Sequence, residues 1–247
     1  MDNSELERII NHKLNSDAFQ DYAPNGLQVE GRREIQRVIT GVTACQALLD
    51  EAVRLQADAV LVHHGYFWKS EPAVIGGMKR QRLKTLLAHD MNLFAWHLPL
   101  DAHPALGNNA LLGNMLGITT RGEITPLVPW GELAAPLDGA AFSQRIAEVL
   151  NRTPLHCGDH APAQIRRVAW CSGGGQGFID DAAAFGVDAF ISGEVSEKTI
   201  HTARECGLHF YAAGHHATER AGIRALGEWL AQQYALDVTF IDIDNPA

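Results

Sequence analysis

The chain has 247 residues, of which 46% are hydrophobic and 20% are charged, and its formal net charge is −9. This is the composition of a globular protein with enough apolar material for one large core or two smaller ones. The acidic balance argues against binding to duplex nucleic acid, because such binding depends on Lys and Arg that neutralise phosphates. No stretch approaches the ~20 apolar residues of a membrane span, so we expect no membrane partner.

The start of the chain, MDNSELERIINHKLNSDAF, has acidic residues where a signal peptide has basic ones. Its apolar residues recur at helical spacing, which predicts an amphipathic helix. The four cysteines lie far apart and form no CxxC pair, which is typical of thiols in a reducing compartment. We therefore expect a cytoplasmic protein.

Two segments of the chain align without a gap. They are RVITGVTACQALLDEAVRLQADAVLVHHG from Arg37 and RVAWCSGGGQGFIDDAAAFGVDAFISGEV from Arg167. Each has the pattern of a short apolar strand, a small-residue turn, an amphipathic helix and a second apolar strand. Such β-α-β units favour a mainly parallel sheet covered by helices. The identical residues in the two aligned segments fit either an internal duplication, which we favour, or a shared architectural pattern.

Prolines and a glycine interrupt the periodicity near residues 124–138. We therefore predict two similar three-layer α/β domains, residues 1–125 and 126–247. The final apolar run, LDVTFIDID, is typical of a closing strand and can pack on either half.

Histidines follow three of the expected strands. DAVLV runs into His63 and His64, LFAW runs into His97, and HFYAAG is followed by His215 and His216. In open α/β sheets, functional groups gather beyond the carboxyl ends of the strands. A histidine pair alone is more often a surface feature, but three clusters in the same setting favour a metal site.

Two of these histidines have an acid four residues further on, Asp101 after His97 and Glu219 after His215. On a helix this spacing places both side chains on one face. The alternative to metal binding is a weak hydrogen bond between the two side chains. Carboxylates can also bridge two cations, and imidazole suits Zn, Fe and Ni. The groups available for two open metal sites are His63, His64, Asp101, His215 and Glu219.

Two further features have open interpretations. SGGGQG at 172–177 matches neither common phosphate-binding glycine motif, and we favour a permissive turn from strand to helix. Glu194 occupies the position in the second segment that the paired histidines occupy in the first. It can face the same site or be an ordinary solvated acid.

The motifs NGLQV, HHGYFW, HLPLDAHPALGNNALLGNMLG, SGE and GHHATE, in this order, resemble the NGG-interacting-factor-three-like family. Members of this family are often labelled GTP cyclohydrolase I type 2 homologues, and the chain is similar to the compact bacterial members. The resemblance implies two similar α/β domains, a dinuclear metal centre between them and a ring-shaped homohexamer. By motif, the ligands would be His63, His64, Asp101, His215 and Glu219, with Glu219 as the bridge. His97 would support the centre or transfer protons.

The resemblance implies two divalent transition-metal ions per chain, with Zn, Fe, Mn and Ni as candidates. We expect a metal-dependent hydrolase that acts on a nucleotide-like substrate, because a two-metal centre activates water and polarises the group under attack. The alternative is a metal-binding scaffold or metal-handling protein that binds a partner without turnover, since fold and metal do not fix function.

Overall fold

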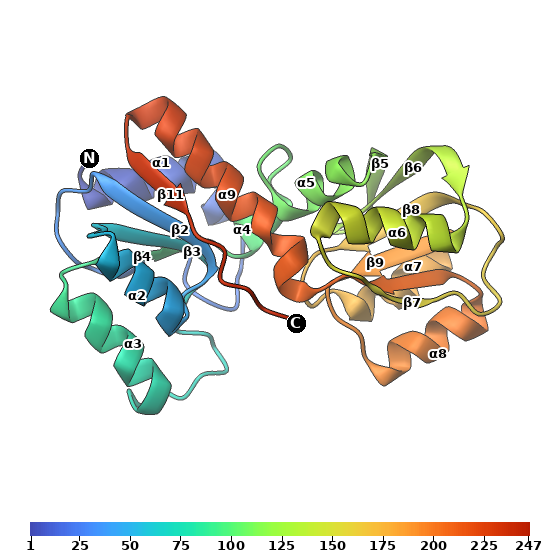
Figure 1. Cartoon of the computed structure of the whole chain (residues 1–247), viewed down its shortest axis with the longest axis horizontal. Coiled ribbons are helices and arrows are strands. Elements are labelled where there is room, and N and C mark those ends of the chain that lie inside the picture. Colours follow the sequence, from blue (N-terminus) through green and yellow to red (C-terminus); the bar gives the residue numbers. More distant parts are fainter. The chain divides into compact units, whose positions relative to one another are not determined.

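The computed structural model describes residues 1–247 and has a mixed α/β fold with two sheets (Figure 1). Residue contacts divide the chain into two compact units, Met1–Leu106 with Gly222–Asp244 and Gly107–Ala221 with Asn245–Ala247. None of the helices combines the length and apolar character needed to cross a membrane. The four cysteines are free thiols.

The first unit contains a five-stranded sheet of order β1-β4-β3-β2-β11, in which only β1 is antiparallel to its neighbour. Its elements, in chain order, are α1 (Asn3–Leu14), η1 (Ser16–Ala18), β1 (Gly26–Val29), β2 (Arg37–Thr43), α2 (Gln46–Arg54), β3 (Ala59–His64), α3 (Gly77–Ala88), β4 (Asn92–Ala95), α4 (Leu98–Ala102) and β11 (Asp237–Phe240). Helix α9 (His215–Tyr234) begins in the second unit and ends in the first.

Helices cover both faces of this sheet, because neighbouring residues of a buried strand point to opposite sides. Val38 packs in one core with Leu6 of α1 and the end of α9. Ile39, the next residue of β2, packs in the other core with Leu48 of α2 and Leu83 of α3. The sheet is therefore the middle of three layers, and its strands read as continuous apolar runs.

The second unit contains a six-stranded sheet of order β5-β6-β8-β9-β10-β7, in which β8, β9 and β10 are parallel. Its elements are α5 (Asn108–Met115), β5 (Ile118–Thr125), β6 (Val128–Leu137), α6 (Gly139–Leu150), β7 (Leu155–Cys157), β8 (Ile165–Cys171), η2 (Gln176–Phe178), α7 (Ile179–Phe185), β9 (Ala189–Ser192), α8 (Glu197–Cys206) and β10 (His209–Ala212). Phe142 and Trp170 belong to the core on one face, and Ile179 and Phe190 to the core on the other.

The observed units differ from the sequence-based division at residues 125 and 126. Most of the stretch with interrupted periodicity forms β6, which lies between β5 and β8 in the second sheet. Pro136 lies where the pairing of β6 with β8 is irregular, which is where a sheet tolerates a missing amide donor. The closing strand β11 pairs with β2, so residues 222–244 belong to the first unit.

The two segments that align in the sequence form the same local structure. Val38 pairs with Ala59 in one sheet, and the aligned Val168 pairs with Ala189 in the other. The shared aspartates also have the same role. Asp58 Oδ2 accepts from the amides of residues 36 and 37 at 2.9 and 2.8 Å. Asp188 Oδ2 accepts from the amides of residues 166 and 167 at 2.9 and 2.7 Å.

These aspartates fix the beginnings of β2 and β8, so we expect Asp58→Ala and Asp188→Ala each to lower the free energy of unfolding by about 1–3 kcal/mol. The Asn variants should lose less, because an amide oxygen still accepts. Urea titration measures the change, with Glu30→Ala as an exposed control expected to stay within about 0.5 kcal/mol. Alanine variants that unfold at the wild-type urea concentration would contradict this role.

Candidate metal centre

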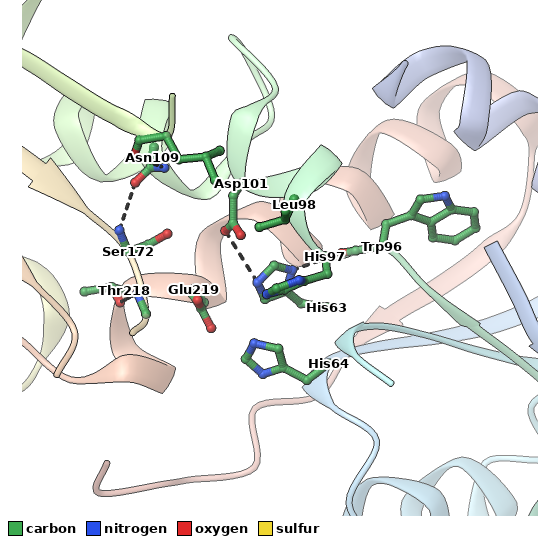
Figure 2. Close-up of polar contacts among 12 residues, drawn as sticks. His63, His64, Trp96, His97, Leu98, Asp101, Asn109, Ser172, Thr218 and Glu219 are labelled. Atoms are coloured by element: carbon green, nitrogen blue, oxygen red, sulfur yellow. Dashed lines mark hydrogen bonds and ion pairs between the residues drawn. The ribbon is translucent and has the colours of Figure 1, made fainter. Parts of the chain in front are cut away.

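Three imidazoles gather at the carboxyl edge of the first sheet. β3 ends at His64 and its parallel neighbour β4 ends just before His97, so both strand ends lie at the same edge. One ring nitrogen from each of His63, His64 and His97 lies within 4.8 Å of the others. Figure 2 shows these rings turned toward one another. Sequence reasoning had not counted His97 among the ligands, but its ring lies with the other two.

Asp101 joins this group through the short helix α4. The amide of Asp101 donates to the carbonyl of His97 at 3.1 Å, so one helical turn separates the two residues and returns the carboxylate to the strand ends. Asp101 Oδ1 lies 3.4 Å from His63 Nε2, an ion pair drawn in Figure 2. His63 is fully buried and Asp101 is 7% exposed, which shields both groups from bulk water.

Each of these imidazoles contacts a protein group through Nδ1. His63 Nδ1 donates to the carbonyl oxygen of Trp96 at 3.0 Å, and His64 Nδ1 lies 3.1 Å from Thr43 Oγ1. His97 Nδ1 donates to Asp21 Oδ1 at 2.7 Å. Groups that hold the second nitrogen of a histidine fix its tautomer and ring orientation, as they do in metal sites. Nε2 of each ring is therefore the candidate ligand atom for a cation.

Asp21 is the residue of this site that sequence reasoning missed. Its carboxylate also accepts from the amides of Tyr22 at 2.6 Å and Leu98 at 2.9 Å and from Asn25 Nδ2 at 3.0 Å. Asn25 in turn accepts from the amide of His97 at 2.8 Å. Burial alone raises the pKa of Asp21, but the hydrogen bonds from His97 and Asn25 outweigh it and lower the pKa to about 2. Asp21 is therefore an anion that holds His97 directly at Nδ1 and, through Asn25, at the backbone amide.

The second unit carries a separate group at the start of α9. His215 Nε2 lies 3.1 Å from Glu219 Oε2, one helical turn further on, and His215 Nδ1 donates to Glu194 Oε1 at 2.7 Å. Glu219 is only 3% exposed. Burial alone lowers the pKa of His215, but Glu219 and then Glu194 outweigh it and raise the pKa to about 9. Glu194 therefore contacts this group, although its side chain is 45% exposed.

The glycine-rich turn packs directly against these side chains. Gly173 has φ +61°, and a Cβ atom there would collide with Glu219 Oε1 and crowd His215 Nε2. The carbonyl of Gly173 accepts from the amides of Gly193 at 2.9 Å and Glu194 at 3.2 Å. Glycine is thus needed both for the left-handed backbone and for the close approach. The favoured interpretation, a permissive turn, describes this segment.

The residues predicted from the sequence therefore form two groups. His63, His64, His97 and Asp101 lie together in the first unit, and His215 and Glu219 lie together in the second. His63, His64 and His97 could hold a metal ion by their spacing, and the imidazole and carboxylate groups of both sets are chemically suited to divalent transition metals.

Comparison with known proteins identifies the family of the chain. The family model Duf34/NIF3 (NGG1p interacting factor 3) matches residues 1–246. A relative from Salmonella typhimurium, named GTP cyclohydrolase 1 type 2 homolog, is 71% identical over 247 residues. The alignment covers 100% of both chains. The solved structure of a protein called ybgI, described as of unknown function, is 70% identical with a TM-score of 0.99 and full coverage of both chains. A structure from Thermus thermophilus is 33% identical with a TM-score of 0.92, again over both full chains.

The fold and the clustered side chains define a mixed α/β protein with histidine and carboxylate groups able to hold metal. The chain belongs to the Duf34/NIF3 family, as the match over residues 1–246 shows. The resemblance noted from the sequence motifs is thereby confirmed.

The lowered pKa of Asp21 has a consequence for stability. A carboxyl group with a lowered pKa stabilises the folded state above its unfolded value of 3.8, and this contribution is lost as the pH falls toward 2. Removing it by Asp21→Asn should cost about 2 kcal/mol at pH 5. The variant should therefore lose less stability than the wild type between pH 5 and pH 2.5.

Urea unfolding of the metal-free protein at both pH values measures this difference. Asp17→Asn, at an exposed acid in the same segment of chain, is the matched control and should behave like the wild type. An Asp21→Asn variant with the same acid sensitivity as the wild type would show that Asp21 is not held as an anion.

Proposed function

We propose that the protein is a metal-dependent hydrolase that binds two divalent transition-metal ions and acts on a nucleotide-like substrate. The ligands are His63, His64, Asp101, His215 and Glu219, so both units contribute. The observation that carries the proposal is the orientation of the imidazoles. In the first unit each Nδ1 contacts a protein group, and one ring nitrogen of each imidazole lies within 4.8 Å of the others.

The donor chemistry fits such ions. Neutral imidazole and carboxylate are ligands of Zn, Fe, Mn and Ni, and the hydrogen bonds at Nδ1 are those that orient histidine ligands in established metal sites. The carboxylate of Glu219 has two oxygens and is the natural bridge between two ions. Without a cation, the proton on His215 offsets part of the negative charge of Glu219 and Glu194, consistent with the raised pKa of His215. A bound ion would take the place of that proton on Nε2.

Divalent ions held by these residues would lower the pKa of water toward neutrality and polarise a phosphoryl group or ring carbon. The residues of the chain supply the rest. The hydrogen bond of 2.7 Å to Asp21 keeps the proton of His97 on Nδ1, so Nε2 can accept a proton from the attacking water. Asp21 remains an anion and stabilises the imidazolium that forms, as the aspartate of a catalytic triad does.

The substrate class rests on the name of the relatives. A protein 71% identical to this chain is called a GTP cyclohydrolase 1 type 2 homolog, which supports a purine nucleotide or a related compound. Both a phosphoester and a purine ring are open to hydrolysis by such a centre. The family resemblance further supports a homohexamer, which sedimentation of the purified protein tests.

The metal content tests the first half of the proposal. We expect about two divalent ions per chain after reloading, as in two-metal hydrolases. Glu219→Ala should remove most metal from both sites, because a bridging ligand serves two ions. His201→Ala, at an exposed histidine outside the centre, should retain the wild-type content. Elemental analysis of chelator-free protein measures this, and fewer than about half an ion per chain in the wild type would overturn the proposal.

Turnover tests the second half. Zn-, Mn- and Fe-loaded protein should hydrolyse at least one member of a panel of purine nucleotides, phosphodiesters and pterin precursors. Glu219→Ala serves as the blank, and His97→Ala should be slower by about 10²–10⁴-fold, the range for loss of a general base. If metal binds but no substrate turns over above the blank, the protein is a metal-binding scaffold or metal-handling protein instead.

A further inference from the structure

Two aromatic side chains flank His97 in the first unit. The ring of Trp68 lies 4.9 Å from the His97 ring, centroid to centroid, at an interplanar angle of 80°. The ring of Tyr22 lies 6.4 Å from it at 61°. Trp68 comes from the loop after β3, and Tyr22 from the segment before β1. Both aromatic rings lie beside the imidazole of His97, so a planar molecule stacked on either ring would lie close to that imidazole.

Tyr22 is exposed although its backbone is held firmly. The residue is 62% exposed, and its own amide donates to Asp21 Oδ1 at 2.6 Å. Its carbonyl accepts from the amide of Lys69 at 2.8 Å, which ties it to the loop that carries Trp68. A large aromatic ring held in water gains nothing for the fold. An exposed ring on a backbone held in this way is accessible to a ligand, and the fixed backbone reduces the conformational entropy lost on binding.

The loop that carries Trp68 is strained at the preceding residue. Phe67 has φ +62°, a left-handed conformation that is unusual for a bulky side chain. It is maintained by a hydrogen bond of 3.0 Å from the Phe67 amide to Glu71 Oε2, and Lys79 Nζ lies 4.9 Å over the Phe67 ring. Trp68 Nε1 then donates to the carbonyl of Gly65 at 3.1 Å, which fixes the indole. Strain of this kind clusters at functional sites.

We propose that Tyr22 and Trp68 form a stacking subsite for a planar nitrogen heteroaromatic ring, such as a purine base. This deepens the proposed function and rests on it for the reaction, but the subsite itself needs no metal. Aromatic side chains bind bases through their faces, which suits a ring better than an aliphatic or purely anionic group. The subsite selects the ring, and Asp21, the residue before Tyr22, aligns His97 beside it.

Calorimetric titration with guanosine 5′-monophosphate and with ribose 5-phosphate tests the subsite, using metal-free and Zn-loaded protein. The nucleotide should bind at least about tenfold more tightly than the sugar phosphate, the gain expected from stacking one base. This preference should persist without metal. Tyr22→Leu and Trp68→Leu should each weaken nucleotide binding by about tenfold and leave sugar-phosphate binding unchanged, because leucine keeps apolar bulk without an aromatic face.

Trp68→Phe should restore most of the affinity, and Tyr234→Leu, at an exposed aromatic residue near the end of α9, should have no effect. Unfolding in urea and metal content, measured on the same samples, separate loss of the ring contact from loss of the fold or of the ions. Equal binding of nucleotide and sugar phosphate, or unchanged nucleotide binding in both leucine variants, would overturn the subsite. Ring binding without any hydrolysis would leave the subsite standing and overturn the proposed reaction.

Discussion

The candidate metal centre depends on one constraint, the occupation of Nδ1 on each of its imidazoles by a protein group. An imidazole has two nitrogens and can rotate about its side-chain bonds, so a free histidine offers no defined ligand atom. A carbonyl, a hydroxyl and a carboxylate hold His63, His64 and His97 in turn. Once Nδ1 is held, the orientation of the ring is restricted, and Nε2 is the candidate ligand atom.

The order of strands in the first sheet explains where these partners come from. β3 lies between β2 and β4, and β1 lies on the far side of β4. Thr43, at the end of β2, is directly paired with His64 in the register of the sheet. Trp96, just after β4, holds His63 of β3, and the segment before β1 holds His97 after β4. His63 and His64 are thus oriented by residues at the carboxyl ends of adjacent strands, and His97 is oriented by the segment that leads into β1.

The second unit applies the same principle with different residues. His215 follows β10, Glu194 follows its neighbour β9, and Gly173 follows β8. Glu194 holds His215 at Nδ1 as the groups of the first sheet hold their histidines. The repeated β-α-β framework, with Asp58 and Asp188 fixing equivalent strand starts, supplies equivalent strand ends. The side chains placed there then differ, so that one unit presents three imidazoles with Asp101 and the other presents His215 with Glu194 and Glu219.

The stacking subsite and the hydrogen bonds to His97 share one segment, since Asp21 fixes the imidazole and Tyr22 extends the adjacent ring into solvent. The loop with Trp68 follows directly after β3 ends at His64 and is tied to Tyr22 through the Lys69 amide. Ring recognition and imidazole orientation therefore depend on the same backbone.

The sequence by itself determined the features that depend on local periodicity. It predicted the aligned β-α-β segments, the histidines at strand ends and the helical spacing of His215 and Glu219, because apolar patterns and turns are encoded within a few neighbouring residues. It did not reveal the role of Asp21, which lies 76 positions from His97. Nor did it reveal the carbonyl of Trp96, because every residue has a carbonyl and only its position after folding makes it a partner.

Tertiary structure also decided the division into units. The prolines near residue 130 suggested a boundary between the two halves, but β6 forms there and pairs with β5 and β8. The closing strand was compatible with either half until its register with β2 assigned it to the first. Local sequence specifies which segments become strands, whereas strand order and side-chain partners arise only when distant segments pack together.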